Sequence, residues 1–436
     1  MRLTVLGTGY LGATHAVCMA ELGFEVLGID VDDAKIARLN AGEVPFFEPG
    51  LEPLLRKSLD SGRLRFTTSY AEVGDFGDVH FICVGTPQKQ GSYEADMRYV
   101  DAVVGDLAPH LTRPTVVVGK STVPSGTAAS VAARLANEAP AGDGVELVWN
   151  PEFLREGFAV EDTLHPDRIV IGVAGGGRAE AVMREVYASM LSTDTPFVVT
   201  DYATAELVKV AANAFLATKI SFINAMAEVC EVVHADVKKL SEALGYDVRI
   251  GPRFLHAGLG FGGGCLPKDI RAFMARAEQL GVDQALSFLR EVDAINLRRR
   301  ARMVDLAHEL VGGADGKRIA IWGAAFKPNS DDIRDSPALD VAATLHAEGG
   351  VVTVYDPAAI ENARRRHPEL QYAESAVAAA ADADVVLHLT EWAEFVQLDP
   401  AAVSGVRHKR IVDGRNALDA ERWRAAGWTY RALGRP

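Results

Sequence analysis

The stretch Leu3–Gly12, LTVLGTGYLG, decides the fold of the first part of the chain. Its apolar start predicts a buried strand, and the G-x-G-x-x-G spacing is typical of the turn between such a strand and a dinucleotide-binding helix. Gly7 permits the tight turn, Gly9 lets backbone approach a pyrophosphate, and Gly12 allows close packing of helix on strand. The alternative is a glycine-rich turn in an α/β domain that binds no dinucleotide.

An acidic residue ends the second predicted strand. Glu25–Asp30 is apolar up to Ile29 and closes with Asp30. A carboxylate at this place accepts hydrogen bonds from the adenosine ribose hydroxyls, and its charge repels a 2′-phosphate. The sequence therefore predicts NAD, in preference to NADP, as the cofactor.

Strand-like and helix-like segments alternate through the first 200 residues, which predicts parallel β-α-β units. The strands expected there are Arg2–Leu6, Glu25–Asp30, Val79–Val84, Thr115–Gly119, Glu146–Trp149, Arg168–Val173 and Phe197–Val199.

From Asp201 the pattern becomes helical. Residues 201–235 contain neither Gly nor Pro and keep apolar residues at helical spacing, which predicts one long helix that begins at an Asp cap. Further helices are expected at Asp236–Leu244, Lys268–Leu280 and Gln284–Val311. The alternation returns near Gly316, with strands expected at Arg318–Trp322, Val351–Tyr355, Val385–Leu389 and Arg410–Val412.

The predicted fold class is therefore α/β, with two Rossmann-like doubly wound domains joined by a central long-helix dimerisation domain. A chain of 436 residues is expected to form two or three domains. The predicted boundaries are 1–200 for the NAD-binding domain, 201–312 for the helical domain and 313–436 for the second Rossmann-like domain.

Composition excludes several classes of protein. A formal charge of −14 argues against general nucleic-acid binding, which needs a basic face. The four cysteines are scattered, so neither a disulfide framework nor a zinc site is expected. No signal peptide is apparent, and the apolar stretches read as too short or too interrupted to span a bilayer. We expect a cytoplasmic protein with no membrane partner.

A thiol beside a glycine run marks the predicted reaction centre. Gly262–Asp269, GGGCLPKD, places Cys265 after three glycines and before Lys268 and Asp269. The thiolate is the reactive form of cysteine, and cations or a helix N-terminus favour it. Glycines let backbone come close to a ligand. A hydride acceptor with an activated cysteine indicates oxidation of an aldehyde through a covalent thioester.

Two other segments carry groups suited to the same chemistry, and we expect them to meet around Cys265 and Asp269. Glu152 and Glu156 lie in a turn just past a predicted strand, where carboxylates can handle protons. Lys209 and Asn213 are four residues apart and share one face of the long helix. An ammonium and an amide on that face can stabilise a developing alkoxide. Taken singly, each of these residues has a plainer reading as a solvated side chain, and Cys265 as a small buried hydrophobe.

Further strand ends extend the predicted site. Cys83–Pro87 and Lys120–Pro124 are expected to flank the nicotinamide half, because ligands bind at the carboxyl ends of parallel strands. Within the first of these segments, Cys83 is predicted to be a buried strand residue. The second Rossmann-like domain lacks the glycine signature, and its first strand ends at Gly323–Lys327. Backbone amides there, with the charge of Lys327, are expected to hold a nucleotide diphosphate.

Together these motifs resemble the UDP-glucose 6-dehydrogenases, within the wider family of nucleotide-sugar 6-dehydrogenases. The resemblance covers nearly the whole chain, and Gly260–Asp269 is its most specific part. Gly264 stands where many relatives have Ser. The other matching segments are Asn40–Gly42, Phe47–Leu51, Lys120–Pro124, Pro151–Gly157, the Lys209/Asn213 helix and Arg249–Gly251.

The resemblance implies an enzyme that oxidises C6 of a UDP-sugar twice and consumes two NAD. Cys265 would attack the intermediate aldehyde to give a thiohemiacetal, the second oxidation would give a thioester, and water would release the uronate. By resemblance, Lys209 and Asn213 stabilise the oxyanion and Asp269 holds a catalytic water. Glu156 and Thr122 assist with that water.

The resemblance also implies the ligand contacts. For NAD these are Gly7, Gly9, Tyr10, Leu11, Gly12, Asp30, Lys35, Thr86, Thr122, Glu156, Lys268 and Arg334. For the UDP-sugar they are Glu152, Phe153, Leu154, Arg155, Glu156, Lys209, Asn213, Arg249, Phe254, Leu255, His256, Ala257, Gly258, Gly262, Lys327 and Arg415. A metal is not expected. Arg249 resembles the arginine that reaches the sugar of a neighbouring subunit, so a homodimer is expected.

Three other readings of the sequence stay open. The same chemistry can act on GDP-mannose or a UDP-N-acetylhexosamine. A two-electron alcohol dehydrogenase shares the first domain, the helical domain and a catalytic lysine, but it needs neither the thiol nor the last domain. A catalytically idle NAD-binding or scaffolding subunit is the reading from a different class.

Overall fold

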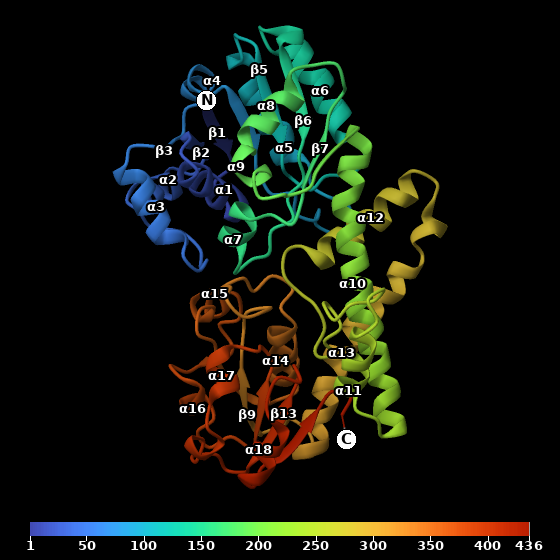
Figure 1. Ribbon diagram of the computed structural model, residues 1–436. Helices are drawn as coiled ribbons and strands as arrows, with labels where there is room; N and C mark the ends of the chain where they lie inside the picture. Colours follow the sequence, from blue (N-terminus) through green and yellow to red (C-terminus); the bar gives the residue numbers. More distant parts are fainter. Residues whose placement is uncertain (436) are drawn as a thin grey trace. The chain divides into compact units, whose positions relative to one another are not determined.

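The structure is a computed structural model and describes residues 1–435, which form two compact units. The first unit comprises Met1–Ala212 with Arg271–Leu280, and the second comprises Asn213–Ile270 and the chain from Gly281 onward. The boundary falls inside two helices, α10 (Tyr202–Val233) and α12 (Leu266–Gln279), so each contributes to both units (Figure 1). The division into three domains with the boundaries given above stays a prediction.

The first unit is built on an eight-stranded sheet with the order β3-β2-β1-β4-β5-β6-β7-β8. Its first six strands have the 3-2-1-4-5-6 order of a dinucleotide-binding fold. Every neighbouring pair is parallel except β6 and β7, which run antiparallel. That pair departs from the all-parallel units expected. The strands are β1 (Arg2–Leu6), β2 (Glu25–Ile29), β3 (Leu64–Thr67), β4 (Val79–Ile82), β5 (Thr115–Gly119), β6 (Val145–Trp149), β7 (Ile169–Gly172) and β8 (Phe197–Thr200).

Helices cover both faces of this sheet, because alternate side chains of its central strands enter two separate cores. Leu3 and Val5 pack with residues of α1, α3 and α8, whereas Leu6 packs with residues of α5 and α6. The helices of this unit are α1 (Tyr10–Glu21), α2 (Asp33–Asn40), α3 (Leu51–Asp60), α4 (Tyr70–Phe76), α5 (Arg98–Leu107), α6 (Thr127–Glu138), α7 (Ala159–Leu164), α8 (Ala179–Val186) and α9 (Ala188–Leu191), with 3₁₀ turns η1 (Ala108–His110) and η2 (Gly142–Gly144).

The second unit contains a six-stranded parallel sheet with the order β11-β10-β9-β12-β13-β14, which repeats the same plan. The strands are β9 (Arg318–Trp322), β10 (Val351–Tyr355), β11 (Gln371–Tyr372), β12 (Val385–His388), β13 (Arg410–Asp413) and β14 (Thr429–Ala432). The helices are α11 (Val237–Gly245), α13 (Phe288–Val311), α14 (Pro337–Ala347), α15 (Ile360–Arg366), α16 (Ala376–Ala379), α17 (Ala393–Gln397) and α18 (Ala420–Ala425), with 3₁₀ turns η3 (Asp283–Leu286) and η4 (Pro400–Ala402).

The predicted strands are all present, and their ends differ from the predicted ones by at most two residues. Three strands were not predicted, β3, β11 and β14, and each lies at an edge of its sheet. An edge strand is exposed on one side and shows no continuous apolar run. β3, for example, alternates between buried and exposed residues, as Leu64 and Phe66 are buried and Arg65 is exposed.

The long helix begins as predicted. The side chain of Asp201 accepts a hydrogen bond from the backbone N–H of Thr204 at 2.9 Å, which caps α10. The expectation that the apolar stretches are too short to cross a bilayer is wrong for this helix, because α10 has the length and the mean hydropathy (1.3) to do so. Such a helix, taken singly among residues 1–435, is weak evidence of a span, since core helices meet the same criteria.

Candidate active site

In the loop Gly7–Gly12, here called the cofactor loop, glycine stands at each of three positions for a different reason. Gly7 has φ +90°, where a side chain is strained. A Cβ on Gly12 would lie 1.7 Å from the carbonyl oxygen of Gly7. Gly9 has ordinary backbone angles, and a Cβ there would meet no atom within 4 Å. Because the protein's own packing does not require Gly9, its open surface at the start of α1 fits a ligand that approaches the backbone, as a pyrophosphate does.

Asp30 directly follows β2 and forms a hydrogen bond with the cofactor loop. Its carboxylate accepts hydrogen bonds from the backbone N–H of Thr8 at 2.9 Å and from the ammonium of Lys35 at 2.9 Å. Burial by itself would raise the pKa of Asp30, but these two donors hold it below its ordinary value. Asp30 is therefore charged at neutral pH, which fits ribose hydroxyls and disfavours a 2′-phosphate.

Hydrogen bonds join the ends of β4, β5 and β6 at the same edge of the sheet. The hydroxyl of Thr86 donates to the carbonyl of Thr122 at 2.6 Å, and the hydroxyl of Ser121 donates to the carbonyl of Val84 at 2.7 Å. The buried ammonium of Lys120 donates to the side chain of Asn150 at 3.0 Å. The two strand ends predicted to flank the nicotinamide are therefore held together. Cys83 is buried, as expected.

The segment Glu152–Gly157, here called the substrate turn, carries a buried ion pair with α10. The ammonium of Lys209 lies 3.1 Å from a carboxylate oxygen of Glu152, and both side chains are mostly buried. Lys209 also lies 5.7 Å from the centre of the Phe153 ring, and Glu156 is buried in the same turn. The predicted proximity of Lys209 and the substrate turn is thus present within the first unit.

One turn further along α10, Asn213 belongs to the second unit and contacts Asp269. The Asn213 amide donates to the Asp269 carboxylate at 2.6 Å, and the ammonium of Lys268 lies 2.5 Å from its other oxygen. Asp269 is 2 % exposed. Asn213, Lys268 and Asp269 therefore form one polar cluster at the start of α12.

Cys265 stands immediately before α12. Its carbonyl accepts the backbone N–H of Asp269 at 2.9 Å, so Cys265 occupies the N-cap position of a 14-residue helix. The partial positive charge at a helix N-terminus favours an anion such as a thiolate. Cys265 is exposed, whereas the other three cysteines within residues 1–435 are buried. Burial raises the pKa of Cys18 and of Cys83 to about 12, which leaves both thiols protonated and inert.

The glycine run before Cys265 serves the packing of the second unit. A Cβ on Gly262 would lie 2.3 Å from the carbonyl oxygen of Asp335, and one on Gly263 would lie 2.7 Å from the Phe326 ring. At both positions the chain itself fills the space in which a side chain would lie, so packing alone requires glycine there, and the ligand contact expected of Gly262 stays a prediction. At Gly264 a Cβ would meet the guanidinium of Arg334, the far end of a flexible side chain.

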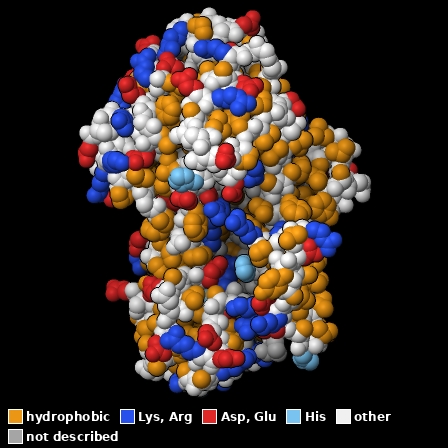
Figure 2. All heavy atoms as spheres, viewed as in Figure 1, with side chains coloured by type: hydrophobic (Ala, Val, Ile, Leu, Met, Phe, Trp, Pro, Cys, Tyr) orange, Lys and Arg blue, Asp and Glu red, His pale blue; other side chains and the backbone are white. Residues whose placement is uncertain are grey.

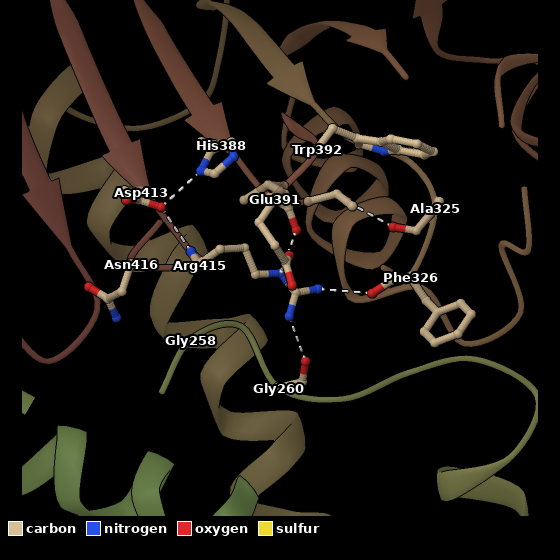
Figure 3. Close-up of polar contacts among 12 residues, drawn as sticks. Gly258, Gly260, Ala325, Phe326, His388, Glu391, Trp392, Asp413, Arg415 and Asn416 are labelled. Atoms are coloured by element: carbon tan, nitrogen blue, oxygen red, sulfur yellow. Dashed lines mark hydrogen bonds and ion pairs between the residues drawn. The ribbon is translucent and has the colours of Figure 1, made fainter. Parts of the chain in front are cut away.

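Arg415, a predicted sugar-nucleotide contact, joins three segments of the second unit (Figure 3). Its guanidinium donates to the carbonyls of Gly260 at 2.9 Å, Phe326 at 3.1 Å and Leu389 at 2.8 Å. Its backbone N–H donates to Asp413, a buried carboxylate. Arg415 therefore holds the loop before Cys265 against the ends of β9 and β12.

The end of β9 differs from what was expected of it. The backbone N–H groups of Ala324 and Ala325 donate to the carboxylate of Asp356 at 2.7 and 2.9 Å. These amides are therefore occupied by the chain, and the expectation that they hold a diphosphate is corrected. Asp356 was missed in the sequence, although its signal was present: it follows the second strand of its sheet, as Asp30 does in the first unit.

Other predicted contact residues lie in a loop of the second unit. Within Phe254–Gly258, His256 is exposed, whereas Leu255, Ala257 and Gly258 are buried. Arg249 is exposed and pairs with Asp247 at 2.6 Å.

Three family models cover most of the chain. They describe the NAD binding domain (residues 1–191), the central domain (residues 203–298) and the UDP binding domain (residues 320–420) of the UDP-glucose/GDP-mannose dehydrogenase family. The chain belongs to the UDP-glucose/GDP-mannose dehydrogenase family. The resemblance noted in the sequence, the α/β fold class and the NAD cofactor are thereby confirmed, and the chain is an NAD-dependent nucleotide-sugar dehydrogenase.

Similar proteins match from end to end. A UDP-glucose 6-dehydrogenase of Rhizobium meliloti (strain 1021) is 44 % identical over 439 residues, covering 100 % of both chains. The structure of a UDP-glucose dehydrogenase from the archaeon Pyrobaculum islandicum matches with a TM-score of 0.91 at 40 % identity, covering 100 % of this chain and 98 % of that one. A UDP-D-ManNAc dehydrogenase from Pyrococcus horikoshii matches with a TM-score of 0.87 at 27 % identity, covering 100 % and 99 %.

Proposed function

We propose that this dehydrogenase oxidises UDP-glucose at C6 to UDP-glucuronate. The observation that carries the proposal is the exposed Cys265 at the N-terminus of α12, within a chain that is 44 % identical to a UDP-glucose 6-dehydrogenase over its whole length. An aldehyde released between two oxidations would react with amines, and a thiol that captures it keeps it in the site. NAD, when bound, supplies the hydride acceptor for each oxidation.

In the proposed reaction, the sulfur of Cys265 forms a bond to C6 and later releases it. The thiolate adds to the C6 aldehyde, a C–S bond forms, and the carbonyl oxygen becomes a thiohemiacetal oxyanion. Loss of the C6 hydride turns that adduct into a thioester. Water then adds to the thioester carbonyl, the C–S bond breaks, and the uronate leaves with Cys265 restored. Each sugar yields two NADH.

Charged and polar groups on α10 and at the start of α12 suit these steps. In the proposal, the buried ammonium of Lys209 and the amide of Asn213 stabilise the C6 oxyanion, since such donors act strongly where water is excluded. Asp269, already an acceptor for Asn213, orients the hydrolytic water. Glu156 and Thr122 assist with that water. The NAD and UDP-sugar contacts named from the resemblance belong to the same proposal.

We also propose a homodimer in which α10 lies at the interface. Its part in the second unit exposes apolar side chains at helical spacing on one face: Phe215 is 67 % exposed, Phe222 50 %, Val229 52 % and Val233 62 %. Figure 2 shows hydrophobic side chains on the surface along the side of the view where α10 runs. A second copy would bury this stripe. In this proposal Arg249, which is exposed, contacts the partner's sugar, as the resemblance implies.

The working compartment in this proposal is the cytoplasm, because a reducing environment keeps the catalytic thiol of Cys265 reduced. No nucleic acid and no membrane is proposed as a partner.

The decisive experiment measures products with purified protein, NAD and a panel of UDP-glucose, GDP-mannose and UDP-N-acetylhexosamines. We expect UDP-glucose to be preferred and two NADH to form for each uronate. Cys265→Ser should stop uronate formation, whereas Cys230→Ala, at a buried cysteine, should retain it. Uronate formed by Cys265→Ser at the wild-type rate would defeat the thioester route, and a preference for GDP-mannose would overturn the assigned sugar. One NADH per sugar would point to a simple alcohol dehydrogenase.

A further inference from the structure

A buried carboxylate outside the reaction centre links the cofactor loop to the substrate turn. Glu48 lies between α2 and α3, and it is 6 % exposed. One of its oxygens accepts the backbone N–H of Gly157 at 2.7 Å, and the other accepts the backbone N–H of Ala159 at 2.7 Å. It also accepts a hydrogen bond from the hydroxyl of Tyr10. Glu48 therefore binds the end of the substrate turn and a residue of the cofactor loop at once.

Hydrogen bonds connect each pair among Tyr10, Glu48 and Gly157. The hydroxyl of Tyr10, which donates to Glu48, also accepts a hydrogen bond from the N–H of Gly157 at 2.9 Å. Tyr10 therefore contacts the substrate turn directly as well as through Glu48. Burial and the charge of Glu48 raise the pKa of Tyr10 well above its usual value. Tyr10 therefore stays protonated and donates to Glu48 over the whole range of pH in which an assay is run. The Tyr10 ring also packs against Phe46, with ring centres 4.8 Å apart.

No step of the proposed reaction uses Glu48, yet a buried carboxylate is costly unless its charge is satisfied. Two backbone N–H groups and one hydroxyl satisfy it here. Gly157, one of these donors, has φ +80°, and it directly follows Glu156. Glycine permits many backbone conformations, and an acceptor that takes the N–H groups on either side of Phe158 restrains the turn to the one observed.

We propose that Glu48 is a positioning residue that couples the two ligand sites of the first unit: a dinucleotide seated on the cofactor loop fixes Tyr10, and Tyr10 and Glu48 fix the substrate turn for the sugar nucleotide. The inference rests on the proposed function, because it takes the substrate turn as a sugar contact. Coupling of this kind is reciprocal, so each ligand tightens the binding of the other.

The isosteric change Glu48→Gln tests the role of the charge. An amide offers one acceptor oxygen where the carboxylate offers two, so the NH₂ group of Gln must face a backbone N–H at either Gly157 or Ala159. With the NH₂ group toward Ala159, the N–H of Ala159 loses its acceptor. With the NH₂ group toward Gly157, the N–H of Gly157 keeps only the Tyr10 hydroxyl, and that hydroxyl loses its carboxylate acceptor. In either orientation a charged hydrogen bond to the end of the turn is lost. We expect the KM for UDP-glucose to rise about tenfold with a smaller change in the KM for NAD, as one lost charged hydrogen bond implies.

Calorimetry gives the readout that a merely structural role would not move. The Kd of UDP-glucose is measured with and without saturating NADH, which permits no turnover. In the wild type we expect NADH to lower this Kd, and in Glu48→Gln and Tyr10→Phe we expect the two values to agree within about twofold, because the link is broken. Tyr10→Phe keeps both backbone hydrogen bonds of Glu48, so it decides the question even if Glu48→Gln folds poorly.

Glu52→Gln is the matched control, since this exposed residue four positions along pairs only with Arg56 among the contacts described for residues 1–435. It should behave as the wild type. Wild-type coupling retained in Tyr10→Phe or in a folded Glu48→Gln, or a wild type without coupling, would overturn the inference. A wild type that forms no uronate from UDP-glucose would instead overturn the proposed function, so the two failures are distinct.

Discussion

At the scale of single residues, position gives side chains of the same type different chemical properties. Four cysteines occur in the chain, and burial leaves Cys18 and Cys83 with a pKa of about 12. Cys265 has the same side chain at an exposed helix N-terminus, where a thiolate is favoured. Lysines differ in the same way: Lys209 is buried against Glu152, whereas Lys239 on α11 is exposed.

The first prediction concerns Lys209. We expect Lys209→Met to lower kcat by about 10²–10³-fold, the usual cost of losing one oxyanion donor. The KM for NAD should change little. Steady-state kinetics check this, with thermal unfolding alongside, because removing one partner of a buried ion pair also destabilises the fold. Lys239→Met is the control, and a kcat of Lys209→Met within threefold of the wild type would contradict the assignment.

The second prediction concerns cofactor choice. Asp30→Ser removes the charge that repels a 2′-phosphate and leaves Lys35 without its carboxylate partner. We expect kcat/KM with NAD to fall and that with NADP to rise, so that their ratio shifts by about tenfold or more. Asp33→Ser, at an exposed position in the first turn of α2, should leave the ratio unchanged. An unchanged ratio in Asp30→Ser would show that this carboxylate does not determine the choice between NAD and NADP.

At the scale of elements, α10 carries three sets of side chains with different surroundings. Its first turns present Lys209 to the substrate turn, the next turn presents Asn213 to Asp269, and its later turns expose the apolar stripe. A helix of 32 residues holds these groups at fixed spacing, because it rises about 1.5 Å per residue. In its later turns, Glu231 forms ion pairs with Arg299 and Arg302 of α13.

The third prediction follows from the apolar stripe on α10. Phe222→Asp places a charge in the proposed interface, where burial would desolvate it, so we expect monomers. Light scattering coupled to gel filtration measures the mass. Val396→Asp changes an exposed apolar residue on α17 and should keep the oligomeric state of the wild type. A dimer of unchanged stability with Phe222→Asp would place the interface elsewhere.

The fourth prediction concerns the packing of α10 on α13. Glu231 accepts from the guanidinium groups of Arg299 at 3.0 Å and Arg302 at 2.7 Å. Burial alone would raise the pKa of Glu231, but these two arginines hold it below its ordinary value. Glu231→Gln should therefore lower the free energy of unfolding by about 2–3 kcal/mol near pH 7, because Arg299 is buried and loses a charged partner.

The pH dependence of this effect has a definite sign. A carboxyl group whose pKa is depressed in the folded state contributes stability above its unfolded pKa, about 4.3, and loses it as the pH falls through the folded pKa. The difference in Tm between wild type and Glu231→Gln should thus narrow in acid. Glu228→Gln removes only the longer contacts of a more exposed carboxylate, with Arg298 at 3.5 Å and Arg299 at 3.8 Å, and should have a smaller effect. A difference that widens as the pH falls would contradict this reading.

At the scale of the whole molecule, each compact unit has its own hydrophobic core and its own sheet. The NAD binding domain model matches the first unit, and the UDP binding domain model matches part of the second. Chains with several domains commonly unfold in more than one step. Ligands should therefore reveal the units separately.

The fifth prediction is that calorimetric unfolding resolves two components that respond to different ligands. NADH should raise the Tm of one and UDP that of the other, since a ligand at about 100 times its Kd stabilises the folded form that binds it by about 2.7 kcal/mol. The Asp30→Ser variant is a control in which the shift by NADH should shrink and the shift by UDP should persist. A single transition that both ligands move equally would show that the units unfold as one.

Much of the fold and part of the site were predictable because their signals lie close together in the chain. The central strands are continuous apolar runs, the cofactor loop has fixed glycine spacing, and α10 has helical periodicity from its Asp201 cap. The proximity of Lys209 to the substrate turn and of Asn213 to Asp269 was also expected. Three of the four edge strands, β3, β11 and β14, were missed, because they show no continuous apolar run, whereas the edge strand β8 was predicted from Phe197–Val199.

The amino-acid sequence by itself determined the class of fold, the dinucleotide signature and the residue types of the reaction centre, because each depends on neighbours within a few residues. Only the tertiary structure decided which buried groups satisfy one another. Glu48 meets Gly157 from 109 residues away, Asp356 takes the amides after β9, and the ring of Phe326 fills the space beside Gly263. A buried donor or carboxylate must find a partner, and which partner it finds depends on segments that only folding brings together.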